Sequence, residues 1–393
     1  MRVCGVIAEY DPFHRGHAWH LTQAKKACGA DYLVCVLSTA FTQRGSPSFF
    51  ATSDRARMAL LGGADAVFAL PVSFSVMEAD RFASGGVQAL GGLGVVTHLS
   101  FGCEDSASFP LLERCASALA HPSPALENAV SQRLGNGLSH VRASAEALAE
   151  ILGIPPDLLR KPNNSLAVAY LRRLEAEASG IVPVPVQRAG RRDERHTDGF
   201  LSSSVIRALL TAGETEEALA ALPDACVSFA GDCLARGAVC APDALDQALL
   251  YRLAGMDASS LARYTTLRDG LPEWILRHAR EASSLSQLLD RTVSRRYTRS
   301  GLRRYLAQVL LDLPRDRLPD RVSCVRLLGF RESARPLLAA IKRQSSLPVV
   351  AKAADRAEAF REDDRAERIR GLGCRSAVSL FQQSPVIIRR DAP

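Results

Sequence analysis

Three of the chain's eight histidines, His14, His17 and His20, fall within seven consecutive positions. They lie in the stretch AEYDPFHRGHAWHL, directly after an apolar run typical of a β-strand and at the start of a segment with helical spacing. A helix N-terminus carries unpaired N–H groups and a partial positive charge, so it favours phosphate. Imidazoles placed there could donate hydrogen bonds to an α-phosphate and to a departing pyrophosphate as charge develops. The pattern predicts phosphate chemistry without a covalent intermediate.

Within this stretch, the motif HRGH places His14 in the turn and His17 in the first helical turn, and we expect both to be catalytic. Gly16 leaves no side chain between the backbone and a bound phosphate. The alternative is that the histidines only cap a helix or fill the edge of a core, but the motif and its position after the first strand favour chemistry. His20 could contact nucleotide or simply pack, and both interpretations stay open.

A second polar group could hold the outer phosphates of a nucleoside triphosphate. In FLSSSVIRALL, residues 202–204 are serines at the predicted start of a helix, and Arg207 follows one turn later. Hydroxyl and guanidinium groups at a helix N-terminus suit β- and γ-phosphates. Alone, these serines would indicate an ordinary N-cap. Paired with HRGH on the same predicted sheet, Ser203 and Arg207 are expected to bind nucleotide.

The elements that must position these residues alternate along the first two hundred residues. Near-continuous apolar runs are typical of strands buried on both faces; they are RVCGVIAE, DYLVCVLS, DAVFALPV, VTHLSFG and IVPVPVQR. Segments of helical period between them mostly end in glycine. The alternation predicts an α/β fold with a doubly wound parallel sheet, which binds ligands at the carboxyl edge of its strands.

After about residue 215 the strand-like runs stop, and helical segments rich in Ala, Leu and Arg follow. We therefore expect two domains, an α/β domain at residues 1–215 and an all-α domain at residues 216–393. A length of 393 residues is enough for two cores. The stretch AKAADRAEAFREDDRAERIR mixes both charge signs at helical spacing, which predicts a solvated helix.

The composition is that of a globular protein, with 47% hydrophobic and 23% charged residues. The net charge of +7 indicates either an anionic partner or a surplus of surface cations. The ten cysteines show no CxxC pair and no histidine at metal-ligand spacing, so we expect buried thiols and no metal site. Without a signal-peptide pattern or a long apolar run, a cytoplasmic location is expected.

The combination of YDPFHRGH early and SSVIR late resembles the HIGH-motif nucleotidyltransferase superfamily, whose Rossmann-like domains transfer the α-phosphate of a nucleoside triphosphate. Further blocks sharpen the likeness: FTQRGSP, RARMALLGGADAVFALPVSF, EADRFASGGVQALGGLG, LSFGCED, RKPNNSLAVAYLRRL, SRRYTRSGLRRYLAQVLL and CVRLLGFRESARPLLAAIK. Together they are similar to the bacterial tRNA(Met) cytidine acetate ligase family over nearly the whole chain.

This resemblance implies an enzyme that activates acetate with ATP, giving acetyl-AMP and pyrophosphate. It would then transfer the acetyl group to N4 of the wobble cytidine of elongator tRNA(Met), forming N4-acetylcytidine. ATP is implied as a substrate, with Mg²⁺ expected to accompany it. The target base would have to be unstacked and splayed out. A basic helical domain could hold the tRNA.

The resemblance also implies a set of ATP-binding residues around the segment from residue 7 to residue 20. They are Ile7, Ala8, Glu9, Tyr10, Asp11, Pro12, Phe13, Gly16, His20, Gly102, Asn163, Asn164, Arg188 and Ala189, beside Ser203 and Arg207.

Other interpretations stay open for several of these positions. Gly102 could be a turn glycine, Asn163 and Asn164 could cap the next helix, and Arg188 could be solvated or reach tRNA. Gln43 and Arg44 could lie near acetate or tRNA, or belong to a loop salt bridge.

The segment RTVSRRYTRSGLRR carries six arginines. The residues expected to contact RNA phosphates are Arg295, Arg296, Arg299 and Arg303, with Tyr297 available to stack on a base. A charged helix face exposed to solvent is the alternative.

Asp11 stands where the family usually has Asn, which bears on the choice of acetate as the carboxylate. Two other functions compete with the ligase. An adenylyltransferase acting on a small phosphate acceptor would usually be a short single domain, whereas the additional helical region favours a macromolecular substrate. A noncatalytic RNA-binding protein with a relic nucleotide fold would be expected to lose site residues that are all present here. The oligomeric state is left open.

Overall fold

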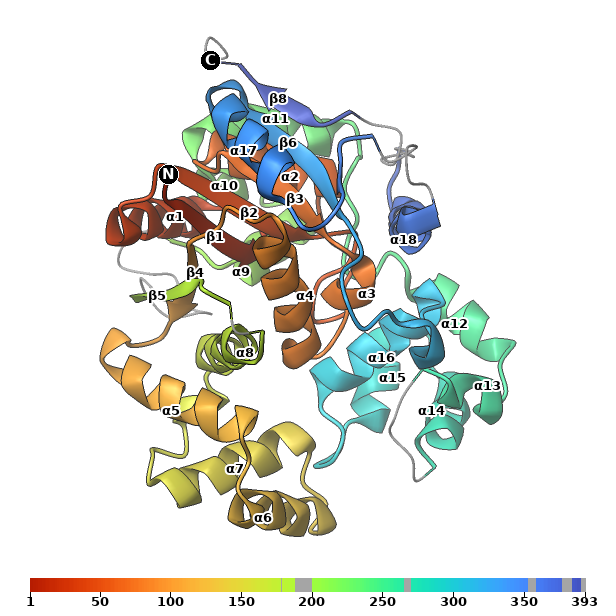
Figure 1. Ribbon diagram of the computed structural model, residues 1–393. Coiled ribbons are helices and arrows are strands. Elements are labelled where there is room, and N and C mark those ends of the chain that lie inside the picture. Colours follow the sequence, from red (N-terminus) through yellow and green to blue (C-terminus); the bar gives the residue numbers. More distant parts are fainter. Residues whose placement is uncertain (178, 188–199, 265–269, 353–357, 377–383, 390–393) are drawn as a thin grey trace.

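The computed structural model describes residues 1–177, 179–187, 200–264, 270–352, 358–376 and 384–389 (Figure 1). Its strands are β1 (Val3–Ala8), β2 (Tyr32–Ser38), β3 (Ala66–Leu70), β4 (His98–Cys103), β5 (Val182–Gln187), β6 (Val325–Arg331), β7 (Val349–Val350) and β8 (Val386–Ile388). They form one sheet in the order β5-β4-β1-β2-β3-β6-β7, with β8 paired to β6. The first five strands are parallel, as the apolar runs predicted.

Helices cover both faces of this sheet. The helices at the sheet and in the first half of the chain are α1 (Arg15–Cys28), α2 (Thr52–Leu61), α3 (Val72–Ser75), α4 (Ala79–Gly92), α5 (Phe109–Ala120), α6 (Pro124–Gly135), α7 (His140–Leu152), α8 (Pro162–Ala176), α9 (Ser203–Ala212), α10 (Thr215–Ala220) and α11 (Asp224–Ala235). The later helices are α12 (Asp246–Ala254), α13 (Ala258–Ala262), α14 (Leu271–Ala279), α15 (Leu285–Thr292), α16 (Arg299–Leu311), α17 (Arg335–Gln344) and α18 (Arg361–Gly371).

The alternation of side chains along β1 divides the core in two. Val3 and Ile7 pack with residues of α4, α8 and α17. Cys4, Val6 and Ala8 pack on the opposite face with residues of α1, α2 and α11. Because β1 is buried on both faces, its sequence is continuously apolar, and the α/β fold class is confirmed.

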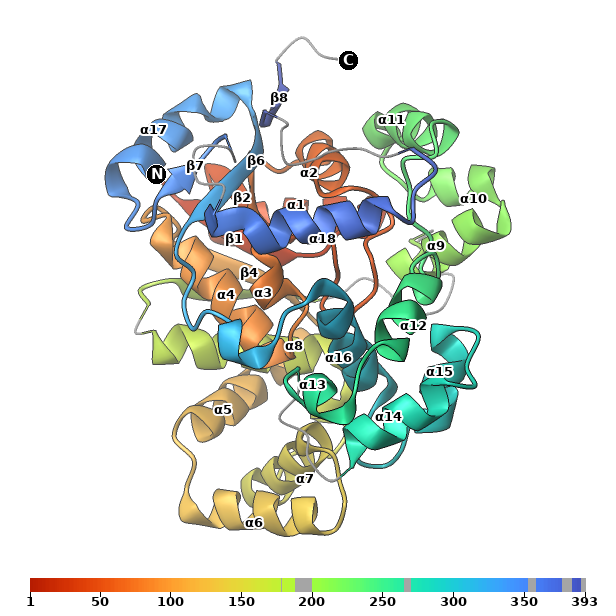
Figure 2. The ribbon, with the colours of Figure 1, turned by 90° about the vertical axis from the view of Figure 1, so that its right-hand side faces the viewer.

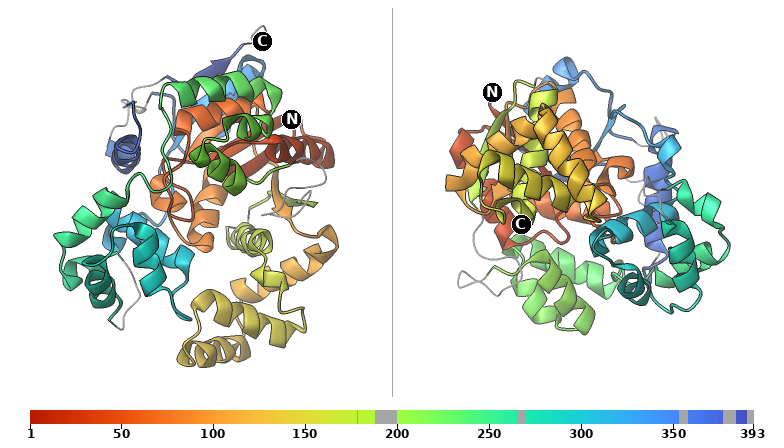
Figure 3. Two further views of the ribbon diagram at one scale, coloured as in Figure 1. Left: turned by 180° about the vertical axis from the view of Figure 1, so that it is seen from behind. Right: turned by 90° about the horizontal axis from the view of Figure 1, so that it is seen from below.

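Two helical lobes project from the same side of the sheet, one made of α5, α6 and α7 and the other of α12 to α16 (Figures 1 and 3). The second lobe has its own core, in which Leu253, Leu261 and Leu306 are fully buried. Within the described ranges, no helix is long and apolar enough to cross a membrane.

The expectation that everything after residue 216 is helical is wrong for its last part. Strand β6 pairs antiparallel with β3, and β7 and β8 pair with β6. Without β6, the apolar strand β3 would be an open sheet edge, and covering it outweighs the helical tendency of the surrounding Arg-rich sequence. The boundary at residue 215 stays a prediction, but the sheet draws strands from both sides of it.

The prediction of a solvated helix near the C-terminus is also wrong. Helix α18 lies across the molecule between the sheet and α16 (Figure 2), and one of its faces is buried. Asp363, Glu367 and Arg370 on that face are each at most 5% exposed. Its mixed charges do not all face solvent, because several of them bind backbone and hydroxyl groups of the segment 39–52.

Candidate active site

The loop between β1 and α1 holds the two predicted catalytic histidines. His14 is the N-cap of α1: its Nδ1 accepts the N–H of Gly16 at 3.0 Å, and Nδ1 of His17 accepts the N–H of His14 at 3.3 Å. The two rings stack with their centroids 3.7 Å apart. Because Nδ1 is an acceptor in both rings, each neutral ring carries its proton on Nε2. The histidines therefore do cap the helix, and capping makes Nε2 of each ring a donor.

Gly16 is required by the His14 ring itself. A Cβ added at residue 16 would lie 2.9 Å from Cε1 of His14, closer than side-chain carbons pack. The prediction from sequence explained the absence of a side chain by phosphate access alone. The structure adds that this absence lets the His14 ring fold back over the helix end.

Replacing Gly16 with alanine should therefore displace the His14 ring without weakening the helix. Alanine has the higher helix propensity, so we expect an unchanged or higher thermal midpoint together with at least a tenfold loss of nucleotide turnover, on the order expected for a misplaced catalytic group. Circular dichroism melts and pyrophosphate release measure the two effects. Gly231→Ala in α11 is the control, since a Cβ there meets nothing within 4 Å. Equal turnover in the two variants would contradict this role.

Aromatic side chains pack against the ring of His17. Tyr10 and Phe13 are buried, and their ring centroids lie 4.8 and 5.7 Å from that of His17. Tyr10 has a φ of 48°, a left-handed conformation that is uncommon outside glycine and that turns the chain from β1 toward Phe13. Pro12, also predicted at the site, follows in this loop. These residues act here through packing and backbone shape.

Helix α9 meets this loop, as the pairing of SSVIR with HRGH predicted. The Ser203 hydroxyl donates to the carbonyl of Pro12 at 3.3 Å. Arg207 donates to the carbonyl of Asp11, and its guanidinium lies 3.4 Å from Oδ2 of the Asp11 carboxylate. The other carboxylate oxygen of Asp11 accepts the N–H of Phe49 at 2.6 Å. Histidine, hydroxyl and guanidinium groups from distant parts of the sequence thus lie around one loop.

Arg55 in α2 is a residue that the sequence analysis did not assign to the site. Its side chain is fully buried. Its guanidinium donates to the carbonyls of Glu9, Ser38, Thr39 and Phe50. These carbonyls follow β1, end β2 and precede α2, so one side chain fixes the carboxyl edge of the sheet. No pattern in a single sequence separates such an arginine from an exposed one on an amphipathic helix.

Helix α18 holds the same region from outside. Arg370 donates to the carbonyls of Ser48 and Phe49, both at 2.8 Å. A carboxylate oxygen of Asp363 accepts the Thr39 hydroxyl at 3.0 Å, and burial raises the pKa of Asp363 to about 7. The segment 39–52 is thereby fixed next to the β1–α1 loop.

At the end of β4, Gly102 has open space where a Cβ would project. The Asn164 side-chain amide hydrogen-bonds to the protein itself: it accepts the N–H of Glu104 at 3.1 Å and donates to the carbonyl of Leu158 at 3.0 Å. Asn163 donates to the Glu104 carboxylate at 2.8 Å. Neither asparagine is the N-cap of α8, so the capping alternative is wrong.

Of three further predicted positions, His20, Arg188 and Ala189, the structure describes only His20. Nε2 of His20 lies 3.3 Å from the hydroxyl of Ser100, and burial lowers the His20 pKa to about 4. At neutral pH this ring is uncharged, so it offers hydrogen bonding rather than a positive charge. Arg188 and Ala189 lie outside the described residues.

The predicted RNA-binding arginines are not equivalent. Arg295, Arg296 and Arg299 are exposed. The Arg296 guanidinium lies 6.0 Å from the ring centroid of Tyr297, and Arg299 pairs with Asp290. Arg303 donates to the hydroxyl of Ser46 at 3.0 Å. The expectation that Tyr297 stacks on a base is wrong. It is only 7% exposed and packs in the core of the α12–α16 lobe beside Trp274, with ring centroids 6.4 Å apart.

Gln43 and Arg44 also differ in their surroundings. The Gln43 side chain donates to the carbonyl of Met77 at 3.0 Å, and its N–H donates to the Glu9 carboxylate. Arg44 is exposed. Gln43 therefore connects its own loop to Glu9 and Met77 by hydrogen bonds and belongs to no salt bridge.

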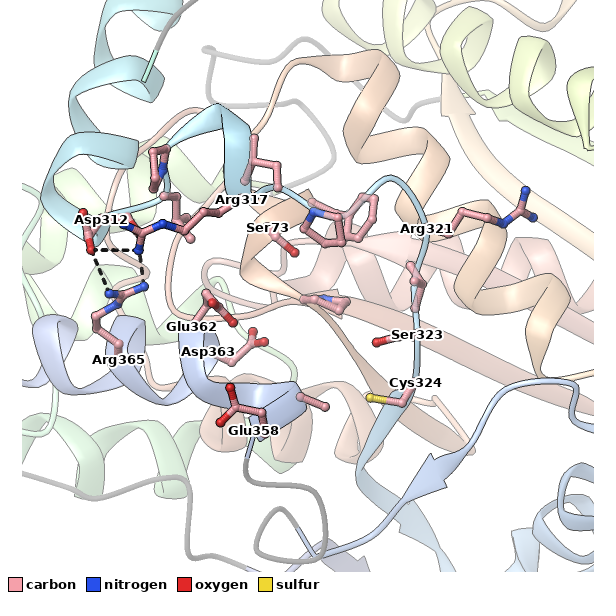
Figure 4. Close-up of a pocket in the computed structure, with 18 residues that line it drawn as sticks. Ser73, Asp312, Arg317, Arg321, Ser323, Cys324, Glu358, Glu362, Asp363 and Arg365 are labelled. Carbon is pink, nitrogen blue, oxygen red and sulfur yellow. Dashed lines mark hydrogen bonds and ion pairs between the residues drawn. The ribbon is translucent and has the colours of Figure 1, made fainter. Parts of the chain in front are cut away.

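A cavity of about 220 Å³ lies away from these residues, between α3, the segment before β6, and α18 (Figure 4). Charged and polar side chains on its wall include Ser73, Arg317, Arg321, Glu358, Glu362 and Asp363. None of the predicted site residues that the structure describes lines it. Asp312 at its edge is paired with Arg365 at 3.2 Å.

Comparison with known proteins first gives the class. The HIGH Nucleotidyl Transferase family model matches residues 1–382, which agrees with imidazoles placed at the β1–α1 junction of a parallel sheet. The crystal structure of Thermotoga maritima TmcAL bound with alpha-thio ATP superposes with a TM-score of 0.91 at 26% identity, covering 99% of this chain and 100% of that chain.

Curated relatives then narrow the class. The tRNA(Met) cytidine acetate ligase of Acetivibrio thermocellus is 32% identical over 372 residues, covering 90% of this chain and 89% of its own. That of Fervidobacterium nodosum is 32% identical over 361 residues, covering 90% and 84%. The chain belongs to the tRNA(Met) cytidine acetate ligase family of HIGH nucleotidyl transferases.

Proposed function

We propose that this chain is an ATP-dependent ligase that activates acetate as acetyl-AMP and acetylates N4 of the wobble cytidine of elongator tRNA(Met). The observation that carries the proposal is the stacked pair His14 and His17 at the N-terminus of α1, with Nδ1 of each ring accepting a backbone N–H, in a chain of this family. Acetate is a weak nucleophile, so the site must hold it in line with the α-phosphate and stabilise the departing pyrophosphate.

In this proposal the two imidazoles donate to the α-phosphate and to the leaving pyrophosphate. The Ser203 hydroxyl and the Arg207 guanidinium, which already contact the β1–α1 loop, are assigned to the outer phosphates. The space over Gly102 at the end of β4 is assigned to the nucleoside, with Asn163 at its rim. Mg²⁺ is expected to enter with ATP.

The experiment that tests the function is acetate-dependent exchange of labelled pyrophosphate into ATP, followed by transfer of labelled acetate to tRNA(Met). Exchange with acetate and label in the anticodon cytidine support the ligase. Pyrophosphate release only with a small phosphate acceptor would favour an adenylyltransferase. Binding of tRNA without any exchange would favour a noncatalytic RNA-binding protein. Formate and propionate as competing carboxylates test whether Asp11 alters the choice of acid.

Filling the space over Gly102 should weaken ATP binding. We expect Gly102→Val to raise the KM for ATP at least tenfold with a similar thermal midpoint, because valine suits a strand and nothing in the protein occupies the space. Steady-state exchange kinetics and a melt measure both. Exposed Gly91, where a Cβ also meets nothing within 4 Å, gives Gly91→Ala as the control. An unchanged KM in Gly102→Val would place the nucleoside elsewhere.

The helical lobe is assigned to tRNA through its exposed arginines. Removing a cation that binds an RNA phosphate should weaken binding and lower its salt dependence, so Arg295→Gln with Arg296→Gln should reduce the slope of log Kd against log salt by up to about two. Filter binding at several salt concentrations measures the slope. The matched control is Arg299→Gln, whose side chain is already paired with Asp290. A slope unchanged by the double substitution would remove these residues from the RNA interface.

A further inference from the structure

We propose that Glu9 is the proton acceptor for the acetyl-transfer step, an inference that rests on the proposed function. Amide formation from acetyl-AMP forms the C–N bond between cytidine N4 and the acetyl carbon and breaks the acyl C–O bond to phosphate. AMP leaves as a phosphate anion. N4 must lose one proton, which here passes to Oε2 of Glu9 and from there to solvent.

The imidazoles are poorly suited to this task. Nδ1 of His14 accepts the N–H of Gly16 and Nδ1 of His17 accepts the N–H of His14, so in the neutral rings Nε2 carries the proton. Such rings donate hydrogen bonds, as the adenylation step needs, but present no acceptor to an amine. The base for the second step is therefore expected among the carboxylates.

Of the two carboxylates in the loop between β1 and α1, Glu9 is the one that is neither buried nor ion-paired within the described residues. The Asp11 carboxylate is held by the N–H of Phe49 and the guanidinium of Arg207. The Glu104 carboxylate accepts from Asn163. Glu9 directly follows β1 and is partly exposed, with one oxygen, Oε1, accepting the N–H of Gln43. That bond orients the carboxylate, while Oε2 has no hydrogen-bond partner among the described residues.

A buried tyrosine hydroxyl senses the charge of Glu9. Tyr170 in α8 is 2% exposed, and its hydroxyl has no hydrogen-bond partner within the described ranges. After burial, the charge of Glu9 is the other cause that raises the pKa of Tyr170. A buried hydroxyl without a partner indicates that a ligand or water completes the site.

The electrostatic surroundings suit a base. Burial raises the pKa of Glu9, the N–H of Gln43 lowers it, the Asp11 charge raises it, and Arg207 and Arg55 lower it, with a net rise. When ionised, a carboxylate of raised pKa is a stronger proton acceptor.

The substitution Glu9→Gln tests the assignment in the full-length chain. Glutamine keeps an oxygen to accept the Gln43 N–H, so the loop is expected to keep its shape. Two rates are compared with those of the unsubstituted chain: acetate-dependent pyrophosphate exchange, and single-turnover transfer from synthetic acetyl-AMP to tRNA(Met). We expect transfer to fall on the order of 100-fold, a typical loss for a general base, and exchange to fall by a much smaller factor.

The control is Glu104→Gln, which removes another carboxylate at the same edge and should leave the ratio of transfer to exchange as it was. Transfer by Glu9→Gln within threefold of the unsubstituted chain, or equal losses in both steps, would overturn the role of Glu9 while the ligase function stands. Absence of exchange and transfer in the unsubstituted chain would instead overturn the proposed function, and this inference with it.

Discussion

Replacing His17 with asparagine should lower acetate-dependent pyrophosphate exchange by about 100- to 1,000-fold, the usual cost of removing one transition-state donor. Asparagine carries an oxygen that can accept the N–H of His14, so it preserves the capping bond while removing the Nε2 donor. Exchange kinetics measure the loss, and circular dichroism with a thermal melt shows whether the chain is folded.

His140→Asn serves as the matched control, because His140 is exposed at the start of α7, far from the site in the sequence. We expect it to leave both exchange and stability unaffected. Exchange by a folded His17→Asn variant within tenfold of the unsubstituted rate would show that the imidazole is only a cap.

The second large effect is expected at Arg55. Methionine in its place would fill much of the volume but leave the carbonyls that now bind the guanidinium, including those of Glu9 and Ser38, buried without donors. We expect a loss of about 3–5 kcal/mol in the free energy of unfolding, together with loss of exchange activity as the loop relaxes. Urea denaturation and exchange assays on the same preparation measure both effects.

Arg57→Met is the control on the same helix. Arg57 is exposed and its guanidinium lies 4.8 Å from the ring centroid of Phe229, so its loss should cost less than about 1 kcal/mol. Similar destabilisation by both substitutions would mean that the carbonyls around Arg55 find other donors.

The sequence allowed prediction of the parts of the fold that depend on local patterns. The five parallel strands are continuous apolar runs, and the start of α9 carries a serine capping signal, so these elements were predictable. Contacts between distant segments were not. Arg55 and Arg370 lie on helices whose charge patterns look solvent-exposed, and only the folded chain shows that each binds backbone carbonyls of the segment 39–52.

The same limitation explains the missed strands. The run VRLLGF in β6 is short and lies between arginine-rich segments, so its neighbours suggested helix. What decides its conformation is the open edge of β3, more than 250 residues earlier in the sequence, since β3 ends at Leu70 and β6 begins at Val325. Likewise, the arginines around Tyr297 suggested a stacking role, but this side chain is buried in the core of the α12–α16 lobe.

The return of β6 to the sheet has a practical consequence. A fragment ending near residue 215 would contain every described histidine and serine assigned to chemistry, yet its third strand would be left with bare N–H and C=O groups. The loss of α18 would also release the segment that holds Asp11 in place. We therefore expect that cutting the chain in two would not give separate catalytic and tRNA-binding fragments. Engineered truncations should keep the C-terminal strands even when only the adenylation step is to be measured.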